Sequence, residues 1–302
     1  MTRVAFIGLG HMGSHMCRHV VKAGFDVSAY DLDPEAVRRA AGDGARPASG
    51  VADCVHGAEL LITSLPGPPQ VEEVLCRAGG TGAIGALSPG ALVVEMSTSS
   101  LEVGRRLHAA AGPAQVQVID APVAGQTIGA QAGTLAIYVG GEPGAVARAL
   151  PVLEAIGDPR RILHVGGPGS GYAVKLLLNL LWFIQSVATA EALTMGVRAG
   201  VELSALHTAL VTSPATSHFL ERDVRSVLDA GDYDEGFAMK LVTKDLGLAV
   251  DLARDVGVPA ELSALVEQIH RRARAAYGDD AGEMSAIRLY EDLVGTELRW
   301  RS

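Results

Sequence analysis

The sequence contains little lysine, little cysteine and few aromatic residues. Only 4 of its 25 basic residues are lysines, and aromatic residues fill 4% of its 302 positions. Its three cysteines, Cys17, Cys54 and Cys76, are odd in number and widely spaced. This spacing argues against a disulfide framework and against a zinc site, so we expect no metal centre. We interpret the cysteines as reduced thiols in the core.

Features of membrane, secreted and nucleic-acid-binding proteins are also missing. No unbroken apolar run reaches the length of a membrane span, and the opening MTRVAFIGLG enters a strand without the zones of a signal peptide. A formal net charge of −9 opposes binding to a nucleic-acid backbone. We therefore expect a cytoplasmic protein whose partners include neither nucleic acid nor a membrane. An anionic substrate has to be drawn in by local cations.

Composition and length indicate a soluble protein with two domains and a large core, since 48% of the residues are hydrophobic and 20% are charged. In the first half, short apolar runs alternate with helical segments. This alternation predicts a parallel sheet covered by helices on both faces, and it leaves the strand order open. The predicted strands are 4–7, 27–30, 60–65, 91–95 and 116–119, and a helix is predicted over 12–23.

A glycine motif lies where the first predicted strand turns into the first helix. The first glycine suits a tight turn, the second lets backbone N–H groups approach a pyrophosphate, and the third lets helix and sheet pack closely. Together with the strand pattern, the motif predicts a Rossmann-type dinucleotide-binding domain over residues 1–165. The motif reads Gly8-Leu9-Gly10-His11-Met12-Gly13.

The end of the second predicted strand bears on the choice of cofactor. Asp31 stands 23 positions after Gly8, where a carboxylate accepts hydrogen bonds from the ribose hydroxyls of NAD and repels the 2′-phosphate of NADP. The competing interpretation, a turn with a helix N-cap, suits Asp33 better than Asp31. NAD is therefore favoured, while the neighbouring Arg38 and Arg39 keep NADP open.

Two further segments follow predicted strands, at the sheet edge where ligands bind in open α/β folds. Residues 96–100 read Met-Ser-Thr-Ser-Ser, and an ordinary helix N-cap also explains one of these hydroxyls. Residues 120–126 read Asp-Ala-Pro-Val-Ala-Gly-Gln. There Pro122 fixes the chain and Gly125 leaves space for backbone amides to face a carboxylate, although a purely structural turn has the same composition.

The second half changes character after the glycine-rich stretch 166–171. From Tyr172 to about Ala199 there is no proline and a single glycine, so a helix of some 28 residues is predicted. Its middle, 176–184, is apolar nearly all round, which calls for burial on several sides, between domains or against another subunit. Helical patterns continue beyond it, and residues 166–302 are predicted to form an all-α domain.

Three of the four lysines fall within this second half, beside an amide and a carboxylate. Lys175 and Asn179 are four apart and share one helix face, as do Lys240 and Lys244, with Asp245 next in sequence. Unlike a guanidinium, a partly desolvated amine exchanges a proton near neutral pH, which suits acid–base chemistry. A solvated helix face is the competing interpretation of the second pair.

Taken together, these motifs resemble the 3-hydroxyisobutyrate dehydrogenase, or β-hydroxyacid dehydrogenase, family, which is distantly similar to 6-phosphogluconate dehydrogenase. The resemblance runs from Val4 to about Glu297. It implies a Rossmann domain, a long interdomain helix and an all-α domain that forms homodimers or homotetramers. The motifs that carry it, in order, are the glycine fingerprint 8–13, the loop 120–125, the stretch from Gly169-Ser170-Gly171 through Lys175 to Asn179, and Lys244-Asp245-Leu246.

The resemblance also implies roles for individual residues. Lys175 is the catalytic acid–base group and Asn179 helps to hold the substrate. Phe237 and Asp245 close the pocket from the α-domain. The cofactor contacts are the six residues of the fingerprint together with Asp31, Leu65, Pro66, Thr98 and Lys244.

The loop that holds the substrate departs from the family pattern. The family usually has Ser-Gly-Gly where this chain has Ala124-Gly125-Gln126. The amides around Ala124 and Gly125 are expected to hold the substrate carboxylate, with Asn179 and Lys240 assisting. The missing hydroxyl removes one donor and Gln126 adds a larger polar group, so the substrate need not be 3-hydroxyisobutyrate.

The expected activity is hydride transfer between NAD or NADP and a small, carboxylate-bearing 3-hydroxy acid or its semialdehyde. An imine reductase is one alternative, but that family usually has Tyr or Asp where this chain has Lys175. The other alternative is a catalytically silent NAD-binding protein that acts through a protein partner. It requires a damaged catalytic set, whereas Lys175, Asn179 and Lys244 are all present.

Overall fold

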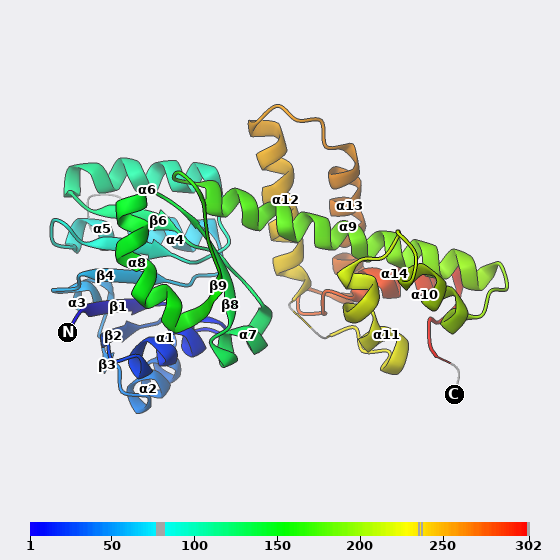
Figure 1. Cartoon of the computed structure of the whole chain (residues 1–302), viewed down its shortest axis with the longest axis horizontal. Helices are drawn as coiled ribbons and strands as arrows, with labels where there is room; N and C mark the ends of the chain where they lie inside the picture. The colour runs from blue at the N-terminus through cyan, green and yellow to red at the C-terminus, as the bar shows by residue number, and fades with distance from the viewer. Residues whose placement is uncertain (77–81, 235, 237, 301–302) are drawn as a thin grey trace. The chain divides into compact units, whose positions relative to one another are not determined.

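The computed structural model describes residues 1–76, 82–234, 236 and 238–300 and is shown in Figure 1. The chain divides into two compact units, Met1–Lys175 (unit 1) and Leu176–Ser302 (unit 2). The boundary predicted from the sequence, between 165 and 166, falls at the end of β9 (Gly157–Gly166). Unit 1 also takes in the first turn of α9 (Ser170–Arg198).

Unit 1 is a doubly wound α/β domain. Six strands run parallel in the order β3-β2-β1-β4-β5-β6, which is the order of dinucleotide-binding domains. The strands are β1 (Arg3–Ile7), β2 (Asp26–Tyr30), β3 (Arg46–Pro47), β4 (Leu60–Thr63), β5 (Leu92–Glu95), β6 (Gln117–Asp120), β7 (Val123–Ala124), β8 (Leu135–Gly140) and β9. The helices are α1 (Gly13–Lys22), α2 (Pro34–Gly42), α3 (Val51–Val55), α4 (Pro68–Cys76), α5 (Ala83–Ala86), α6 (Leu101–Ala114), α7 (Gln126–Ala132) and α8 (Pro143–Ile156).

All five predicted strands are present, and the predicted helix over 12–23 is α1. The sheet continues beyond them, however, because β8 pairs antiparallel with both β6 and β7, and β9 pairs parallel with β8. The predicted parallel sheet is therefore confirmed for β1 to β6, and at this end it is extended by antiparallel pairing that the sequence did not predict. The sequence of β9, GDPRRILHVG, contains proline and two arginines and is half exposed, so it lacks the apolar run by which buried strands are recognised.

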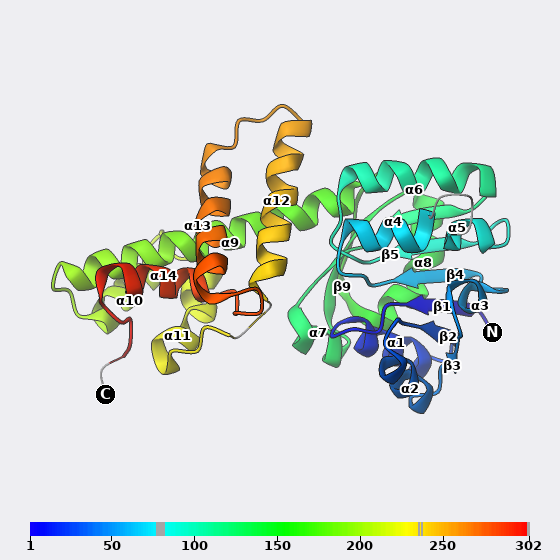
Figure 2. The same ribbon diagram turned by 180° about the vertical axis from the view of Figure 1, so that it is seen from behind.

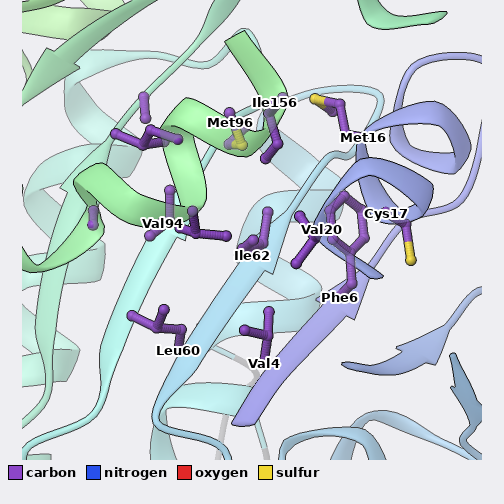
Figure 3. Packing of buried hydrophobic residues seen from close by; sticks show 14 of the residues in the cluster. Val4, Phe6, Met16, Cys17, Val20, Leu60, Ile62, Val94, Met96 and Ile156 are labelled. Atoms are coloured by element: carbon purple, nitrogen blue, oxygen red, sulfur yellow. The ribbon is translucent and has the colours of Figure 1, made fainter. Parts of the chain in front are cut away.

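Alternating side chains of the sheet build two apolar layers. Val4 and Phe6 of β1 pack on one face and Ala5 and Ile7 on the other, as the pleat of a strand requires. Figures 1 and 2 show α1, α2 and α8 over the first face and α4, α5 and α6 over the second. Figure 3 shows the first layer, where Met16, Cys17 and Val20 of α1 approach the strands. Each large side chain buried there contributes roughly 1.5–3 kcal/mol.

The cysteines are free, as expected. Cys17 and Cys54 are buried, and burial raises the pKa of each thiol to about 12. Both therefore behave as small apolar side chains of the core. Cys76, at the end of α4, is only half-buried.

Unit 2 is helical, as predicted. Its described part contains no strand, only an isolated bridge between Ala238 and Gly282. The helix predicted over 172–199 is α9, which has 29 residues. The elements after it are α10 (Leu203–Val211), the π-helical turn η1 (Phe219–Asp223), α11 (Arg225–Ala230), α12 (Met239–Asp255), α13 (Glu261–Tyr277) and α14 (Ser285–Val294).

Helix α9 is apolar enough, by length and composition alone, to span a membrane, although it contains no long unbroken apolar run. Phe183 is buried in unit 2, and the ring of Trp182 contacts Phe183 and Phe219 edge-to-face. These contacts make α9 a core helix of unit 2. Burial is nevertheless incomplete, because Leu177 and Leu181 are 48% and 58% exposed.

Candidate active site

The glycine fingerprint has the backbone geometry that dinucleotide binding requires. Gly8 has φ +97°, and a Cβ there would collide with the carbonyl oxygen of Ser64. A Cβ on Gly13 would collide with the carbonyl oxygen of Gly8, so the third glycine lets α1 pack against the turn. Around Gly10, in contrast, the space is open, which leaves room for a pyrophosphate. The fingerprint therefore fits the group that its sequence predicts.

Asp31 lies beside this loop. Its carboxylate accepts hydrogen bonds from the backbone N–H of Leu9 at 2.6 Å and of Asp33 at 2.8 Å. Asp33 is the N-cap of α2, as expected, and accepts from the N–H of Glu35. The carboxylate of Asp31 faces a hollow of about 360 Å³, a size that suits the adenosine end of a dinucleotide. The hollow is lined by Leu9, Gly10, His11, Ser14, His15, Asp31, Asp33, Ala36 and Arg39.

The loops after β4 and β5 are connected to each other. Leu65, two residues after β4, donates its backbone N–H to the hydroxyl of Ser97 at 2.8 Å. Thr98 follows at the same edge of the sheet and is half-buried. Ser100 is the N-cap of α6, so the N-cap interpretation of segment 96–100 is confirmed for this residue. Pro66, beside Leu65, is exposed.

A buried carboxylate that the sequence analysis missed lies beneath these loops. Glu95, the last residue of β5, is fully buried, and burial raises its pKa. It accepts hydrogen bonds from the hydroxyl of Tyr172 at 2.6 Å, the backbone N–H of Ser97 at 2.9 Å and the hydroxyl of Thr63 at 3.3 Å. In the sequence, Glu95 is an acid at the end of an apolar run. Such an acid is equally expected where a strand leaves the core and enters solvent.

Asp120 connects the segment 120–126, named the substrate loop after its expected role, to the start of α9. Its carboxylate accepts from the backbone N–H of Gly169 at 2.7 Å and of Tyr172 at 3.0 Å. These amides belong to the N-terminus of the helix, where a negative charge is favourable. Burial nevertheless raises the pKa of Asp120. This carboxylate therefore fixes the start of the helix that carries Lys175.

The rest of the substrate loop runs close to the glycine fingerprint. Ala124 ends β7 and Gly125 precedes α7. Gln126 is exposed and has φ +55°, which is unusual for any residue other than glycine. The hydroxyl of the next residue, Thr127, lies 4.0 Å from the sulfur of Met12. Unit 1 thus joins the fingerprint, the substrate loop and the first turn of α9 within one body, and Lys175 is its last residue.

The remaining predicted polar residues lie in unit 2. Asn179 donates its side-chain amide to Asp245 at 2.6 Å, and the ammonium of Lys244 lies 3.0 Å from the other oxygen of the same carboxylate. Asp245 is only 4% exposed. It therefore orients Asn179 and Lys244. Lys240 is more exposed and pairs with Asp280 at 2.6 Å, while the predicted Phe237 lies outside the described residues.

Two family models match the chain. The model described as the NAD binding domain of 6-phosphogluconate dehydrogenase matches residues 3–166. The model described as NAD-binding of NADP-dependent 3-hydroxyisobutyrate dehydrogenase matches residues 169–290. The chain belongs to the β-hydroxyacid dehydrogenase family.

Curated relatives and solved structures agree with this membership. The chain is 36% identical to 3-hydroxyisobutyrate dehydrogenase of Pseudomonas aeruginosa, over 92% of this chain and 95% of that protein. It is 34% identical to 2-(hydroxymethyl)glutarate dehydrogenase of Eubacterium barkeri, over 98% and 97%. The structure of Mycobacterium tuberculosis 3-hydroxyisobutyrate dehydrogenase with L-serine has a TM-score of 0.87 at 31% identity, and the match covers 96% of this chain and 99% of that one.

Family membership confirms the class of activity expected from the sequence, an NAD(P)-dependent β-hydroxyacid dehydrogenase that acts by hydride transfer. Imine reductases are more distant. The enzyme from Myxococcus stipitatus is 18% identical with a TM-score of 0.64, over 95% of this chain and 98% of that one. A likeness at that level concerns the fold alone.

Proposed function

We propose that this β-hydroxyacid dehydrogenase interconverts a short 3-hydroxy acid and its semialdehyde with NAD, and that Lys175 is the acid–base group. The observation that carries the proposal is the connected structure of unit 1. Met12 of the fingerprint meets Thr127 next to the substrate loop, and Asp120 at the start of that loop holds the first turn of α9. The glycine fingerprint, the substrate loop and Lys175 are therefore joined within unit 1.

The chemistry follows from the residues at hand. Bound NAD would supply the nicotinamide ring as the acceptor of a hydride, that is, of a hydrogen nucleus with two electrons. In the oxidative direction a neutral Lys175 takes the proton of the substrate hydroxyl as the C–H bond at the carbinol carbon breaks. In the reductive direction a charged Lys175 returns that proton to the developing alkoxide. An arginine stays protonated and is unable to do both.

Two groups of residues are proposed to bind substrate, and each is described within its own unit. In unit 1, the backbone amides of Ala124, Gly125 and Gln126 are proposed to hold the carboxylate. In unit 2, Asn179 is proposed to contact the substrate. A carboxylate accepts hydrogen bonds, so Asp245 binds the amide nitrogen of Asn179 and thereby sets the orientation of this side chain. Lys240, one turn before Lys244 on α12, is proposed to assist, and it does so only where its pair with Asp280 opens.

The substrate class is proposed from the altered loop and the relatives. The names of the two curated relatives denote different hydroxy acids, and the Eubacterium barkeri enzyme is named for a dicarboxylate. This chain lacks a hydroxyl at Ala124 and presents the amide of Gln126, which both donates and accepts. We therefore propose a 3-hydroxy acid with a second polar group.

For the cofactor, the geometry around Asp31 supports NAD over NADP. Its carboxylate faces the hollow, and Arg39, which lines the same hollow, lies 3.6 Å from Asp33. Arg38 pairs with Glu35. Both arginines thus have carboxylate partners in the first turn of α2, whereas a 2′-phosphate would meet the charge of Asp31.

We also propose that the protein works in the cytoplasm as a homodimer or homotetramer. Free, buried cysteines suit a reducing compartment. Leu177, Leu178 and Leu181 on α9 are exposed, and a second copy is the proposed occupant of this apolar surface. Size-exclusion chromatography with light scattering gives the molar mass of the protein in solution. A value near the mass of one chain, 31.3 kDa, would reject the homo-oligomer.

The test of function is turnover with NAD or NADP on a panel of 3-hydroxyisobutyrate, 3-hydroxypropionate, serine, glycerate and 4-hydroxybutyrate. Lys175→Ala is expected to lose nearly all turnover while NAD binding, measured by calorimetry, changes little. Lys22→Ala, an exposed lysine of α1, is the matched control with wild-type rates. Equal activity in Lys175→Ala would remove this lysine from the mechanism, and wild-type silence across the panel would reject the substrate class.

A further inference from the structure

The hydrogen bond between Glu95 and Tyr172 takes no part in the chemistry described above, yet it lies at the centre of unit 1. Both side chains are at most 1% exposed, and the phenol donates to the carboxylate at 2.6 Å. Desolvating an acid is costly, and well-packed apolar residues often serve stability equally well. Stability alone therefore gives little reason for this pair.

The pair connects the cofactor side of the domain to the helix that bears Lys175. On one side, Glu95 accepts from the N–H of Ser97, whose hydroxyl accepts from the N–H of Leu65. On the other side, Tyr172 belongs to the first turn of α9 and lies three residues before Lys175. A short chain of hydrogen bonds thus runs from the loop after β4 to this helix.

The ring of Tyr172 fits a space made for it. A Cβ placed on Gly104 of α6 would lie 3.3 Å from Cε2 of the ring, which is tight. The backbone N–H of Tyr172 is held by Asp120 at the same time. The residue is therefore held at its backbone, its ring and its hydroxyl.

We propose that Glu95 and Tyr172 are positioning residues that fix the first turn of α9 relative to the loop after β4, which holds the expected cofactor contact Leu65, and so direct Lys175 at the reacting hydroxyl. Residues three apart are neighbours on a helix surface, so a small rotation at Tyr172 moves Lys175 with it. The inference rests on the proposed role of Lys175. Its effect falls on the chemical step, because misplacement of a catalytic group slows a reaction without weakening binding elsewhere.

The test compares Tyr172→Phe, which keeps the ring and removes the hydroxyl, with Tyr138→Phe, the same change at a half-buried residue of β8. For Tyr172→Phe, kcat is expected to fall about tenfold or more, while KM for NAD stays within about twofold. The deuterium isotope effect on the substrate C–H bond should rise, because hydride transfer becomes more rate-limiting. Hydrogen exchange of the backbone in 169–175 should become faster, and Tyr138→Phe should match wild type in all four measurements.

Two variants of the acid sharpen the result. Glu95→Gln keeps one acceptor oxygen for the phenol but places an NH2 group beside the N–H of Ser97, so part of kcat is expected to be lost, whereas Glu95→Ala is expected to lose at least as much as Tyr172→Phe. The double variant Glu95→Ala/Tyr172→Phe should be no slower than Glu95→Ala, since that variant alone already removes the bond from the phenol together with those from Ser97 and Thr63. If Tyr172→Phe does not fold, Gly104→Ala displaces the ring instead, and the same fall in kcat is expected.

Two results would contradict this inference, and a third would contradict the function on which it rests. A lower melting temperature with wild-type kcat and isotope effect would assign the pair to folding and overturn the inference. Unchanged hydrogen exchange in 169–175 would overturn it whatever the activity. Wild-type silence on every hydroxy acid would instead reject the proposed function, and with it the role of Lys175.

Discussion

The side-chain amide of Asn179 donates a hydrogen bond to the buried carboxylate of Asp245 over 2.6 Å. The other oxygen of Asp245 lies 3.0 Å from the ammonium of Lys244, but the geometry is not that of a hydrogen bond, and this oxygen has no hydrogen-bond partner among the described residues. The contact between Asp245 and Lys244 is therefore an ion pair without a directed hydrogen bond. One carboxylate thus positions two side chains to which the family resemblance assigns different roles, substrate binding for Asn179 and cofactor binding for Lys244.

Removing the charge of Asp245 should impair both substrate binding through Asn179 and cofactor binding through Lys244. Asp245→Asn retains an acceptor for Asn179 but loses the attraction to Lys244 and the charge-assisted hydrogen bond. Because such bonds contribute about 1.5–3 kcal/mol, we expect kcat/KM to fall roughly 10- to 100-fold. Asp251→Asn, at an exposed residue of the same helix paired with Arg254, is the control for steady-state kinetics. Wild-type kcat/KM in Asp245→Asn would show that this carboxylate serves packing only.

The left-handed backbone of Gln126 gives a second prediction, about specificity. A residue other than glycine held there costs of order 1 kcal/mol or more, so Gln126→Gly should not lower the melting temperature. The amide would be lost at the same time, and we expect activity on polar 3-hydroxy acids to fall relative to 3-hydroxyisobutyrate. Gln115→Gly is a close control, because Gln115 has φ +53° at the end of α6. An unchanged order of substrates in Gln126→Gly would exclude the side chain from selection.

Much of the fold was predictable, and the reasons lie in particular segments. The strand at 4–7, the glycines at 8–13 and the proline-free stretch after 171 are local patterns whose meaning depends little on distant residues. In contrast, β9 is an exposed edge strand with polar sequence, and its pairing with β8 depends on a partner that precedes it by one helix. A local sequence pattern therefore does not reveal which strand β9 pairs with.

The site divides in the same way. The fingerprint and Asp31 have geometry that fits their expected duties, since their spacing follows from one strand–turn–helix unit. Glu95 and Tyr172 are 77 positions apart, and only the folded chain brings them together. The partnership of Asp245 with Asn179 likewise joins α12 to α9, so the sequence showed a carboxylate but not what it orients.

A third prediction concerns the cofactor. Asp31→Asn keeps an oxygen that accepts from Leu9 but removes the negative charge that faces the hollow. We expect the ratio of kcat/KM for NADP to that for NAD to rise about tenfold or more, since one close charge repulsion disappears. Asp26→Asn, an exposed carboxylate at the start of β2, should leave the ratio unchanged. An unchanged ratio in Asp31→Asn would mean that this carboxylate does not discriminate between the cofactors.

The fourth prediction concerns His270, a fully buried histidine of α13. One ring nitrogen lies 2.9 Å from the carbonyl oxygen of Val266, the other has no partner among the described residues, and the ring contacts Phe183 edge-to-face. Burial lowers the pKa of His270 from 6.5 to about 4. The folded protein therefore keeps a neutral imidazole at a pH where the unfolded chain already binds a proton.

The sign of the effect on stability follows from that difference. As the pH falls from about 6.5 towards 4, protons bind the unfolded state first, so the free energy of unfolding decreases by up to about 1.4 kcal/mol per pH unit, roughly 3 kcal/mol in all. His270→Phe keeps a ring against Phe183 and abolishes this titration. Glu95 and Asp120, whose pKa values burial raises, act in the opposite direction but are present in both proteins. Urea unfolding at pH 7 and at pH 4.5 should therefore show a smaller loss of stability in His270→Phe than in wild type, and equal losses would mean that His270 is protonated in the folded protein.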